Sequence, residues 1–327
     1  MLTDLDRAGL EAYRSTHETP DDFDAFWRST LAETRAHDLD LEVTPVDTDL
    51  VTVRVYDVRF AGYGGHPVRA WLRMPRADGP FPAVVQFHGY ASGRGAPIED
   101  LLWASAGYAH LLVDVRGQGG QYAGGGATAD PVGGGPSHPG FLTRGIEDPE
   151  TYFYRRVFAD AVRAVDAVGA LSCVDSSRVG VVGASQGGGI ALAIAGLADV
   201  TALHVQAPFL CDIRRATLIT GAGPYTEISE YLAARRTSVR RVFDTLAYFD
   251  GVGFARRGTA PAWFSTGLMD DVCPPSTAFG AYHAYAGPKH IQVWDYNGHE
   301  AGGPEDLVIA LAEFRTLLKP QRNEEQQ

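Results

Sequence analysis

Residues 179–189 read VGVVGASQGGG, in which a short apolar run leads into a cluster of glycines around Ser185. The pattern Gly183-x-Ser185-x-Gly187, after a strand and before a helix, is typical of a nucleophilic serine on a sharp turn. Such a turn leaves no room for a side chain two residues before or after the serine. A phosphate-binding turn would instead follow GxGxxG or end in Lys-Ser or Lys-Thr, and this stretch does neither. The stretch therefore predicts that Ser185 is a nucleophile with an exposed hydroxyl group.

A serine hydroxyl is a weak nucleophile near neutral pH, so a neighbouring base must accept its proton. In folds with this turn, the base is a histidine that follows the last strand. His299 follows the predicted strand 291–296 through Asn297 and Gly298, whereas the other histidines fall on predicted helices, in or beside strands, or in loops upstream of Ser185. A surface histidine in an unrelated loop is the alternative. The order of the elements favours His299 as the general base.

The carboxylate that orients the histidine is expected after the penultimate strand. The predicted strand 264–269 leads directly into Asp270 and Asp271. Asp270 lies nearer the strand end, and we predict that it accepts the imidazole N–H and stabilises the imidazolium ion. Asp271 is the alternative that the spacing leaves open; its other expected role is to cap the following helix. Asp295 is a weaker candidate, because it is expected inside a strand.

Two backbone N–H groups are expected to stabilise the tetrahedral oxyanion of the reaction. One belongs to the residue after the nucleophile, Gln186, and the other to the loop after an early strand, where we select Tyr90. His88 in the same loop is interpreted as a structural histidine. Another loop, Arg116-Gly117-Gln118, follows a second strand end. These residues are predicted either to contact substrate or to support the neighbouring glycine-rich loop.

Short apolar runs that suit buried strands alternate with segments of helical periodicity along most of the chain. The predicted strands are 83–87, 110–115, 178–183, 202–207, 262–268 and 290–296, and the predicted helices include 152–170, 190–197 and 304–318. Residues 50–74 alternate around a turn at 62–65, which predicts an antiparallel hairpin. The chain therefore predicts an α/β-hydrolase fold: a mostly parallel central sheet with antiparallel N-terminal strands and helices on both faces.

We expect a single domain over residues 1–327, with additions to the core. Residues 1–40 are expected to form an N-terminal helical extension. Residues 208–261 interrupt the alternation with charged helical pieces and predict an inserted helical cap; solvated surface helices are the alternative. The long glycine-rich segment 116–139 is expected to border the active site. The polar tail 320–327 is expected to fray.

The composition limits the partners of this 327-residue chain. It carries 40 acidic residues against 28 Lys and Arg, a net charge of −12, and so repels phosphate backbones and anionic lipid surfaces. We expect neither a nucleic-acid partner nor membrane association. The chain start lacks the apolar run of a secretory signal, and three cysteines without CxxC spacing argue against disulfides and a zinc site. We therefore expect a cytoplasmic location, reduced and buried cysteines, and no metal or cofactor.

Three motifs together resemble those of carbohydrate esterase family seven, the acetyl xylan esterases and cephalosporin C deacetylases. They are RGQ at 116–118, GxSQG at 183–187 and HE at 299–300. Further similar segments are DFDAFW at 22–27, YFYRR at 152–156, PFLC at 208–211, YFDG at 248–251, GLMD at 267–270 and PPST at 274–277. The resemblance thus covers most of the chain. The glycine triplets at 124–126 and 133–135 depart from the family pattern, which leaves the leaving-group preference open.

The resemblance implies that Ser185, Asp270 and His299 are nucleophile, acid and base, and it selects Asp270 over Asp271. It also implies that Tyr90 and Gln186 donate to the oxyanion. It further implies small acetylated substrates, namely short acetylated sugars and cephalosporin C, and a homohexamer whose active sites face an inner cavity.

Three functional hypotheses follow from the sequence. The first is a serine carboxylic ester hydrolase that removes acetyl groups through an acyl-enzyme. The second keeps the same three residues but cleaves a different ester, an amide or a peptide bond. Peptidases of this fold usually carry a propeller domain, and this chain has no repeated blade pattern. The third is a non-catalytic binding protein on the same scaffold, against which the complete set of three residues argues.

Overall fold

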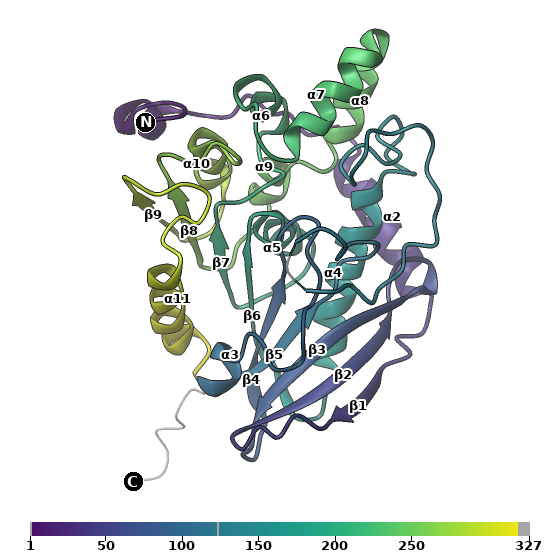
Figure 1. Ribbon diagram of the computed structural model, residues 1–327, viewed down its shortest axis with the longest axis vertical. Coiled ribbons are helices and arrows are strands. Elements are labelled where there is room, and N and C mark those ends of the chain that lie inside the picture. The colour runs from purple at the N-terminus through teal and green to yellow at the C-terminus, as the bar shows by residue number, and fades with distance from the viewer. Residues whose placement is uncertain (1, 123, 320–327) are drawn as a thin grey trace.

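The fold, seen in a computed structural model, is described for residues 2–122 and 124–319. Within these residues, one nine-stranded sheet runs through the molecule in the order β1-β2-β3-β5-β4-β6-β7-β8-β9 (Figure 1). The strands are β1 (Glu42–Val46), β2 (Val53–Ala61), β3 (Pro67–Pro75), β4 (Phe81–Phe87), β5 (Ala109–Val113), β6 (Val174–Ala184), β7 (Ala202–Gln206), β8 (Ala262–Gly267) and β9 (Lys289–Trp294). The tail 320–327, which the sequence predicts to fray, lies outside the described residues.

The sheet is mixed, as predicted. β2 is antiparallel to both of its neighbours, β1 and β3, and β3 is antiparallel to β5. The six remaining strands, from β5 to β9 across the sheet, are parallel. The predicted hairpin is formed by β2 and β3, with Val58 opposite Ala70 and both side chains buried. Strand β1 was not predicted because its side chains are mostly exposed, so it carries no apolar alternation.

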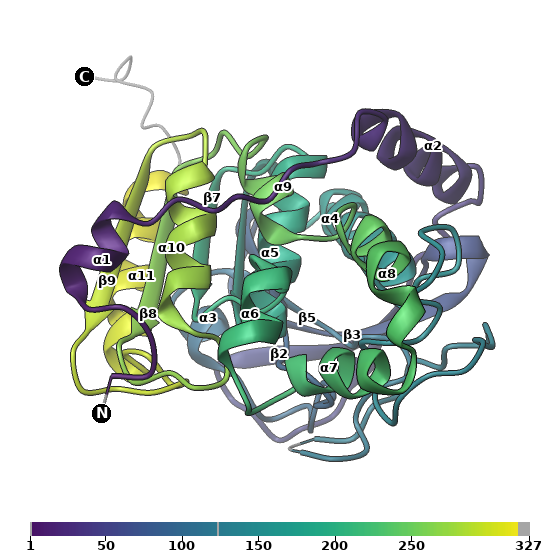
Figure 2. The same cartoon turned by 90° about the horizontal axis from the view of Figure 1, so that it is seen from above.

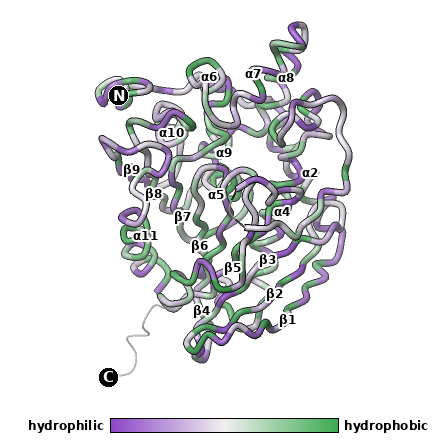
Figure 3. Tube along the Cα trace, viewed as in Figure 1, coloured by the Kyte–Doolittle hydropathy of each residue, from purple (hydrophilic) through white to green (hydrophobic). Residues whose placement is uncertain are grey.

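Helices cover both faces of the sheet, because successive strand residues point to opposite sides. The helices are α1 (Arg7–Ala12), α2 (Phe23–Arg35), α3 (Leu102–Ser105), α4 (Phe153–Gly169), α5 (Gln186–Leu197), α6 (Ile213–Ile219), α7 (Tyr225–Ala234), α8 (Val239–Leu246), α9 (Gly251–Ala255), α10 (Pro275–Ala284) and α11 (Pro304–Leu317). Val85 and Val181 pack in the cluster that contains α4 and α5. Val84 and Val182 pack in a second cluster, which contains Phe314 of α11. The central strands and α5 carry mostly hydrophobic residues (Figure 3).

The N-terminal extension packs onto the core through an aromatic cluster. Trp27 of α2 is 1% exposed, and its ring lies 5.4–5.8 Å from the rings of Phe158, Phe249 and Phe254. The Trp27 indole N–H donates to the Tyr248 carbonyl at 3.0 Å. Helix α2 is therefore held both by α4 and by the turn between α8 and α9. Figure 2 shows α2 apart from α1, which lies next to α10.

The segment between β7 and β8, called the insertion below, covers the predicted cap 208–261 and contains α6, α7, α8 and α9. Helices α6, α7 and α8 gather at one end of the molecule (Figure 1), whereas α9 is buried and packs against α5. Within the described residues, no helix is both long enough and apolar enough to cross a membrane. All three cysteines are free; Cys211 and Cys273 are buried as expected, but Cys173 is only half-buried.

Candidate active site

Ser185 lies on the turn that joins β6 to α5. Its φ of 55° and ψ of −119° are values that non-glycine residues rarely adopt. The strained turn is held from both sides: the Ser185 N–H donates to the Gln206 carbonyl at 2.9 Å, and the Phe209 N–H donates to the Ser185 carbonyl at 2.9 Å. The turn therefore points the serine side chain away from the sheet while its backbone stays bound to the chain around β7.

The glycines on either side of Ser185 are required by close backbone contacts. A Cβ atom on Gly183 would lie 2.1 Å from the carbonyl carbon of Gly187. A Cβ atom on Gly187 would lie 2.1 Å from the carbonyl oxygen of Phe87, at the end of β4. Both distances are far below van der Waals contact, so any side chain at these positions would force the backbone apart. This is the steric basis of the glycine spacing in the sequence.

His299 lies between Ser185 and Asp270. Its Nε2 atom is 2.9 Å from Ser185 Oγ, and its Nδ1 atom is 2.9 Å from Asp270 Oδ2. These side chains are 114 and 29 residues apart in the sequence, and the fold brings all three together. The arrangement is that of a serine, a base and an orienting carboxylate. The imidazole is 31% exposed, so it can reach a bound substrate.

The carboxylate of Asp270 is fully buried, and three donors satisfy it. Its Oδ1 atom accepts the N–H groups of Val272 at 2.9 Å and Cys273 at 2.8 Å, and its Oδ2 atom accepts from His299. These bonds compensate for removing the charge from water. They also fix the plane of the carboxylate, so that one oxygen faces the imidazole.

The two competing aspartates take no part in this arrangement. Asp271 is exposed, and α10 begins after Pro274 without a side-chain cap of its own, so the expected capping by Asp271 is wrong. The Ser276 N–H of that helix instead donates to Asp4 at 2.8 Å, a carboxylate from the start of the chain. Asp295 lies in the turn after β9 and is exposed, so its expected position inside the strand is also wrong.

The loop that carries His299 is held by a residue that the sequence analysis missed, Asp306. This carboxylate is fully buried in the first turn of α11. It accepts the Trp294 indole N–H at 3.0 Å and the Gly302 N–H at 2.8 Å, which lie before and after His299. One side chain therefore binds both ends of the loop. An acidic residue in the first turn of the helix after the histidine is the only sequence signal for this role.

The two predicted oxyanion donors come from neighbouring elements. Gln186 begins α5, and Tyr90 follows β4, which pairs with β6 beside Ser185. Within the described residues, neither backbone N–H donates to a protein acceptor. Both groups are therefore free to donate to an oxygen of a bound substrate.

The RGQ residues lie beside these loops, with Arg116 and Gln118 buried and Gly117 exposed. The Gln118 side chain accepts the Ala91 N–H at 2.8 Å and donates to the Gln186 side chain at 2.8 Å, so it joins the two loops. Arg116 is 1% exposed and forms a bidentate pair with Asp160 at 2.6 and 2.7 Å. Gly117 has a φ of +69°, which favours glycine. Of the two roles that the sequence leaves open, this geometry favours loop support over substrate contact.

His88 is nearly buried at the end of β4, and its Nε2 atom accepts the Val115 N–H at 2.9 Å. This is the contact of a neutral structural histidine, as interpreted from the sequence. Among the described residues, no group of three or more His, Cys, Asp or Glu side chains could hold a metal ion.

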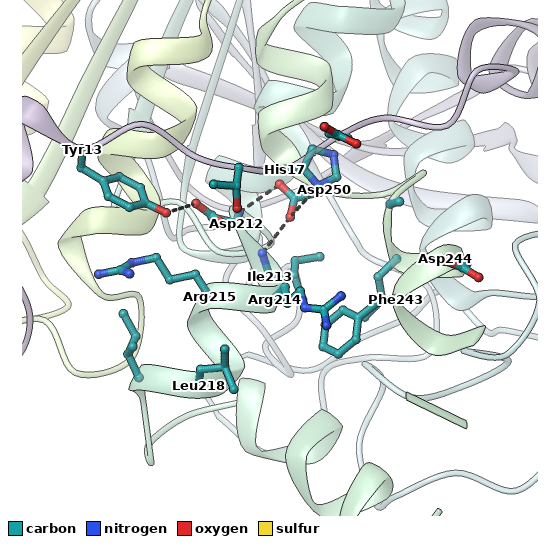
Figure 4. A pocket seen from close by; sticks show the side chains of 15 residues that line it. Tyr13, His17, Asp212, Ile213, Arg214, Arg215, Leu218, Phe243, Asp244 and Asp250 are labelled. Carbon is teal, nitrogen blue, oxygen red and sulfur yellow. Dashed lines mark hydrogen bonds and ion pairs between the residues drawn. The ribbon is translucent and has the colours of Figure 1, made fainter. Parts of the chain in front are cut away.

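A separate pocket of about 610 Å³ lies between the N-terminal segment, α6 and α8 (Figure 4). Its walls include Tyr13, whose hydroxyl donates to Asp212 at 2.6 Å, and Asp250, which accepts the Ile213 N–H at 2.7 Å. Burial and the neighbouring Asp250 raise the pKa of Asp212. Ser185, Asp270 and His299 do not line this pocket, so it is distinct from the candidate active site.

Comparisons with known proteins agree with the geometry. The family model for acetyl xylan esterase (AXE1) matches residues 1–311. Acetyl esterase Axe7A of Xylanibacter ruminicola is 29% identical over 295 residues, which cover 86% of this chain and 64% of that protein. The chain thus spans slightly less than two thirds of that relative.

Solved structures of similar proteins cover the whole fold. An acetyl xylan esterase from Paenibacillus sp. R4 is 37% identical, with a TM-score of 0.89 over 96% of this chain and 100% of its own. Acetyl xylan esterase 1 from a Thermoanaerobacterium species is 34% identical, with a TM-score of 0.87 over 95% and 99%. An acylaminoacyl peptidase of Pyrococcus horikoshii, 16% identical with a TM-score of 0.61 over 85% of this chain and 44% of its own, is similar in fold alone.

Proposed function

The chain belongs to the acetyl xylan esterase (AXE1) family, and on this premise we propose that it is a serine carboxylic ester hydrolase that removes acetyl groups from acetylated xylo-oligosaccharides. The observation that carries the proposal is the continuous contact from Ser185 Oγ through His299 to Asp270, with both distances at 2.9 Å. This geometry suits acyl transfer, because it supplies a nucleophile, a base within reach of its proton, and an acceptor that orients the base.

In the acylation step, Ser185 Oγ attacks the acetyl carbonyl carbon while His299 Nε2 takes the hydroxyl proton. Asp270 stabilises the imidazolium ion that forms. The carbonyl oxygen becomes an oxyanion, which the N–H groups of Tyr90 and Gln186 bind. The intermediate then collapses: the bond to the sugar oxygen breaks, and His299 gives its proton to the departing alcohol.

In the deacylation step, a water molecule replaces the sugar alcohol. His299 takes a proton from the water, and the resulting hydroxide attacks the acetyl-Ser185 carbonyl carbon. The second tetrahedral intermediate uses the same two N–H groups. When it collapses, the bond to Ser185 Oγ breaks, the serine recovers its proton from His299, and acetic acid leaves and ionises to acetate in solution. All the proton transfers thus pass through one imidazole.

Three finer points belong to the same proposal. We infer that cephalosporin C is deacetylated at the same site, because its acetyl ester offers the same carbonyl to Ser185. We infer a homohexamer and a cytoplasmic location as well. The resemblance carried by the RGQ, GxSQG and HE motifs supports the hexamer, and the three free cysteines support a reducing, cytoplasmic location.

The test is acetate release from acetylated xylo-oligosaccharides, cephalosporin C and small peptides or amides in parallel. We expect release from the first two and no peptide cleavage. Ser185→Ala should lower the rate by a factor of about 10³ or more while the protein stays folded. Ser176→Ala is the matched control, because Ser176 is an exposed serine on the same strand β6. Peptide cleavage without acetate release would instead support the peptidase hypothesis, and retained activity in Ser185→Ala would refute the nucleophile.

A further inference from the structure

The phenol of Tyr90 lies in a closed hydrogen-bond cluster beside the proposed oxyanion site. Its hydroxyl donates to Glu227 Oε1 at 2.6 Å and accepts the Phe141 N–H at 2.6 Å. Its ring packs edge-on against Phe141 and Phe209, with centroids 5.5 and 5.8 Å apart. Burial and the carboxylate of Glu227 raise the pKa of Tyr90. The phenol is therefore fixed in place, and its proton is committed to Glu227 rather than to the reaction.

Glu227 comes from the insertion, on α7, and lies 137 residues from Tyr90 in the sequence. It is 8% exposed, and its second oxygen accepts the Leu142 N–H at 3.0 Å. Gly140 covers the carboxylate so closely that a Cβ atom there would lie 2.1 Å from Glu227 Oε1. A buried carboxylate with two donors is costly to disturb, because the loss of either donor leaves an unsatisfied group. Glu227 thus ties Tyr90 and the loop at 140–142 to the insertion.

The backbone of Tyr90 connects this cluster to the reaction. Its N–H is the proposed oxyanion donor, and the next N–H along the chain, that of Ala91, is held by Gln118 at 2.8 Å. The other proposed donor, Gln186, is fixed by the start of α5. The direction of the Tyr90 N–H is therefore set by Gln118 on one side and by the clamped phenol on the other. Donors to an oxyanion must be placed closely, since a displacement of about 1 Å can cost about 10²-fold in rate.

We propose that Glu227 is a positioning residue for the oxyanion site: by holding the Tyr90 hydroxyl, it directs the Tyr90 N–H toward the developing charge. The inference rests on the proposed esterase function and extends it, because it gives one helix of the insertion a part in the transition state. Glu227 itself contacts neither substrate nor the reacting atoms.

Glu227→Gln and Tyr90→Phe remove the same contact from opposite sides. In Glu227→Gln, the amide oxygen can accept only one of the two donors, so an amide NH₂ must face either the Tyr90 hydroxyl or the Leu142 N–H. We expect each substitution to lower kcat about ten- to hundredfold, with KM unchanged within about threefold. Rates are expressed per active site, counted by stoichiometric labelling with a fluorophosphonate. The double variant should lose little more than either single variant, because both act on one contact.

A second readout separates positioning from a general structural role. Trifluoroacetone adds reversibly to the serine oxygen and forms a tetrahedral oxyanion, so its affinity reports on the oxyanion donors. We expect its affinity to fall by the same factor as kcat/KM. Glu230→Gln is the matched control: Glu230 lies on the same helix, is exposed and pairs with His138 instead of Tyr90. This variant should leave kcat and the affinity for trifluoroacetone unchanged.

Each outcome decides the proposal. It is overturned if Glu227→Gln keeps more than half of kcat per active site, if the trifluoroacetone affinity does not follow the rate, or if the two losses simply add. If Glu227→Gln does not yield folded protein, Tyr90→Phe decides by the same two measurements. Failure of the unaltered protein to release acetate would overturn the esterase function and this inference together. Normal acetate release with an insensitive Glu227 would overturn the inference alone.

Discussion

Replacement of Asp270 by asparagine changes which nitrogen of His299 carries the proton. In the structure, Asp270 Oδ1 accepts the N–H groups of Val272 and Cys273, and Oδ2 faces His299 Nδ1. In Asp270→Asn, the amide oxygen must stay with the two backbone donors, since an NH₂ group there would meet two N–H groups. The NH₂ group then points at Nδ1, which must accept a hydrogen bond instead of donating one. The ring proton therefore moves to Nε2.

A proton on His299 Nε2 blocks catalysis directly. The imidazole then donates to Ser185 Oγ and can no longer take its proton. In serine proteases with the same arrangement, this substitution lowers kcat about 10⁴-fold through the wrong tautomer. That factor corresponds to about 5.5 kcal/mol of transition-state stabilisation. We expect a similar loss here, because both contacts of the imidazole are hydrogen bonds of 2.9 Å. The fold should persist, because the asparagine keeps the size of the side chain and both backbone hydrogen bonds.

The measurement is kcat for acetate release, with thermal unfolding as the check on folding. Asp271→Asn is the matched control, because Asp271 is the adjacent carboxylate and is exposed. We expect this control to keep nearly full activity. The reasoning is refuted if Asp270→Asn stays within about tenfold of the unaltered protein, or if Asp271→Asn loses as much activity as Asp270→Asn.

Two further predictions concern a glycine of the serine turn and a buried histidine of β7. Gly187→Ala places a methyl group 2.1 Å from the Phe87 carbonyl oxygen. We expect this substitution to lower both the melting temperature and kcat. An alanine variant with unchanged melting temperature and activity would show that the turn can relax. Burial lowers the pKa of His204 to about 4. Between pH 6.5 and 4, therefore, the His204 imidazole takes up a proton in the unfolded chain but not in the folded protein. The free energy of unfolding should fall by up to about 3 kcal/mol as the pH decreases through this range. Urea unfolding at pH 7 and 4.5 checks the second prediction, since His204→Gln should reduce the fall, and an equal fall in the variant would contradict it.

The positions of Ser185, Asp270 and His299 could be predicted because the sheet converts chain order into proximity. The carboxyl ends of parallel strands meet at one edge of a sheet, so residues that follow different strands come together there. Ser185 follows β6, Asp270 closely follows β8 and His299 follows β9, and these strands lie within four adjacent positions of the sheet. Apolar runs and glycines are sufficient to locate strand ends. The proximity of the three residues then needs no knowledge of side-chain packing.

The supporting residues could not be predicted in this way. Glu227 and Asp306 are carboxylates on helices, and by their spacing each would pass for an ordinary surface residue. Their burial depends on how α7 and α11 pack against loops distant in the sequence, which periodicity does not encode. The expectation that Asp271 caps α10 failed for the same reason. Asp4 satisfies the Ser276 N–H across 272 residues, and no local pattern announces that contact.

The chain outside the sheet is therefore part of the proposed catalytic machinery rather than a cover for it. The Thr3 hydroxyl donates to the Asp270 carbonyl at 2.8 Å, so the N-terminal extension supports the acid. Glu227 supports Tyr90 from the insertion, and Asp306 supports the His299 loop from the final helix. The sheet brings the three proposed catalytic residues to one edge, at the ends of nearby strands. Hydrogen bonds of 2.9 Å between their side chains also require that the loops carrying them are held in place. Because each support comes from a different segment, an error in packing any one of them should lower kcat before it unfolds the protein.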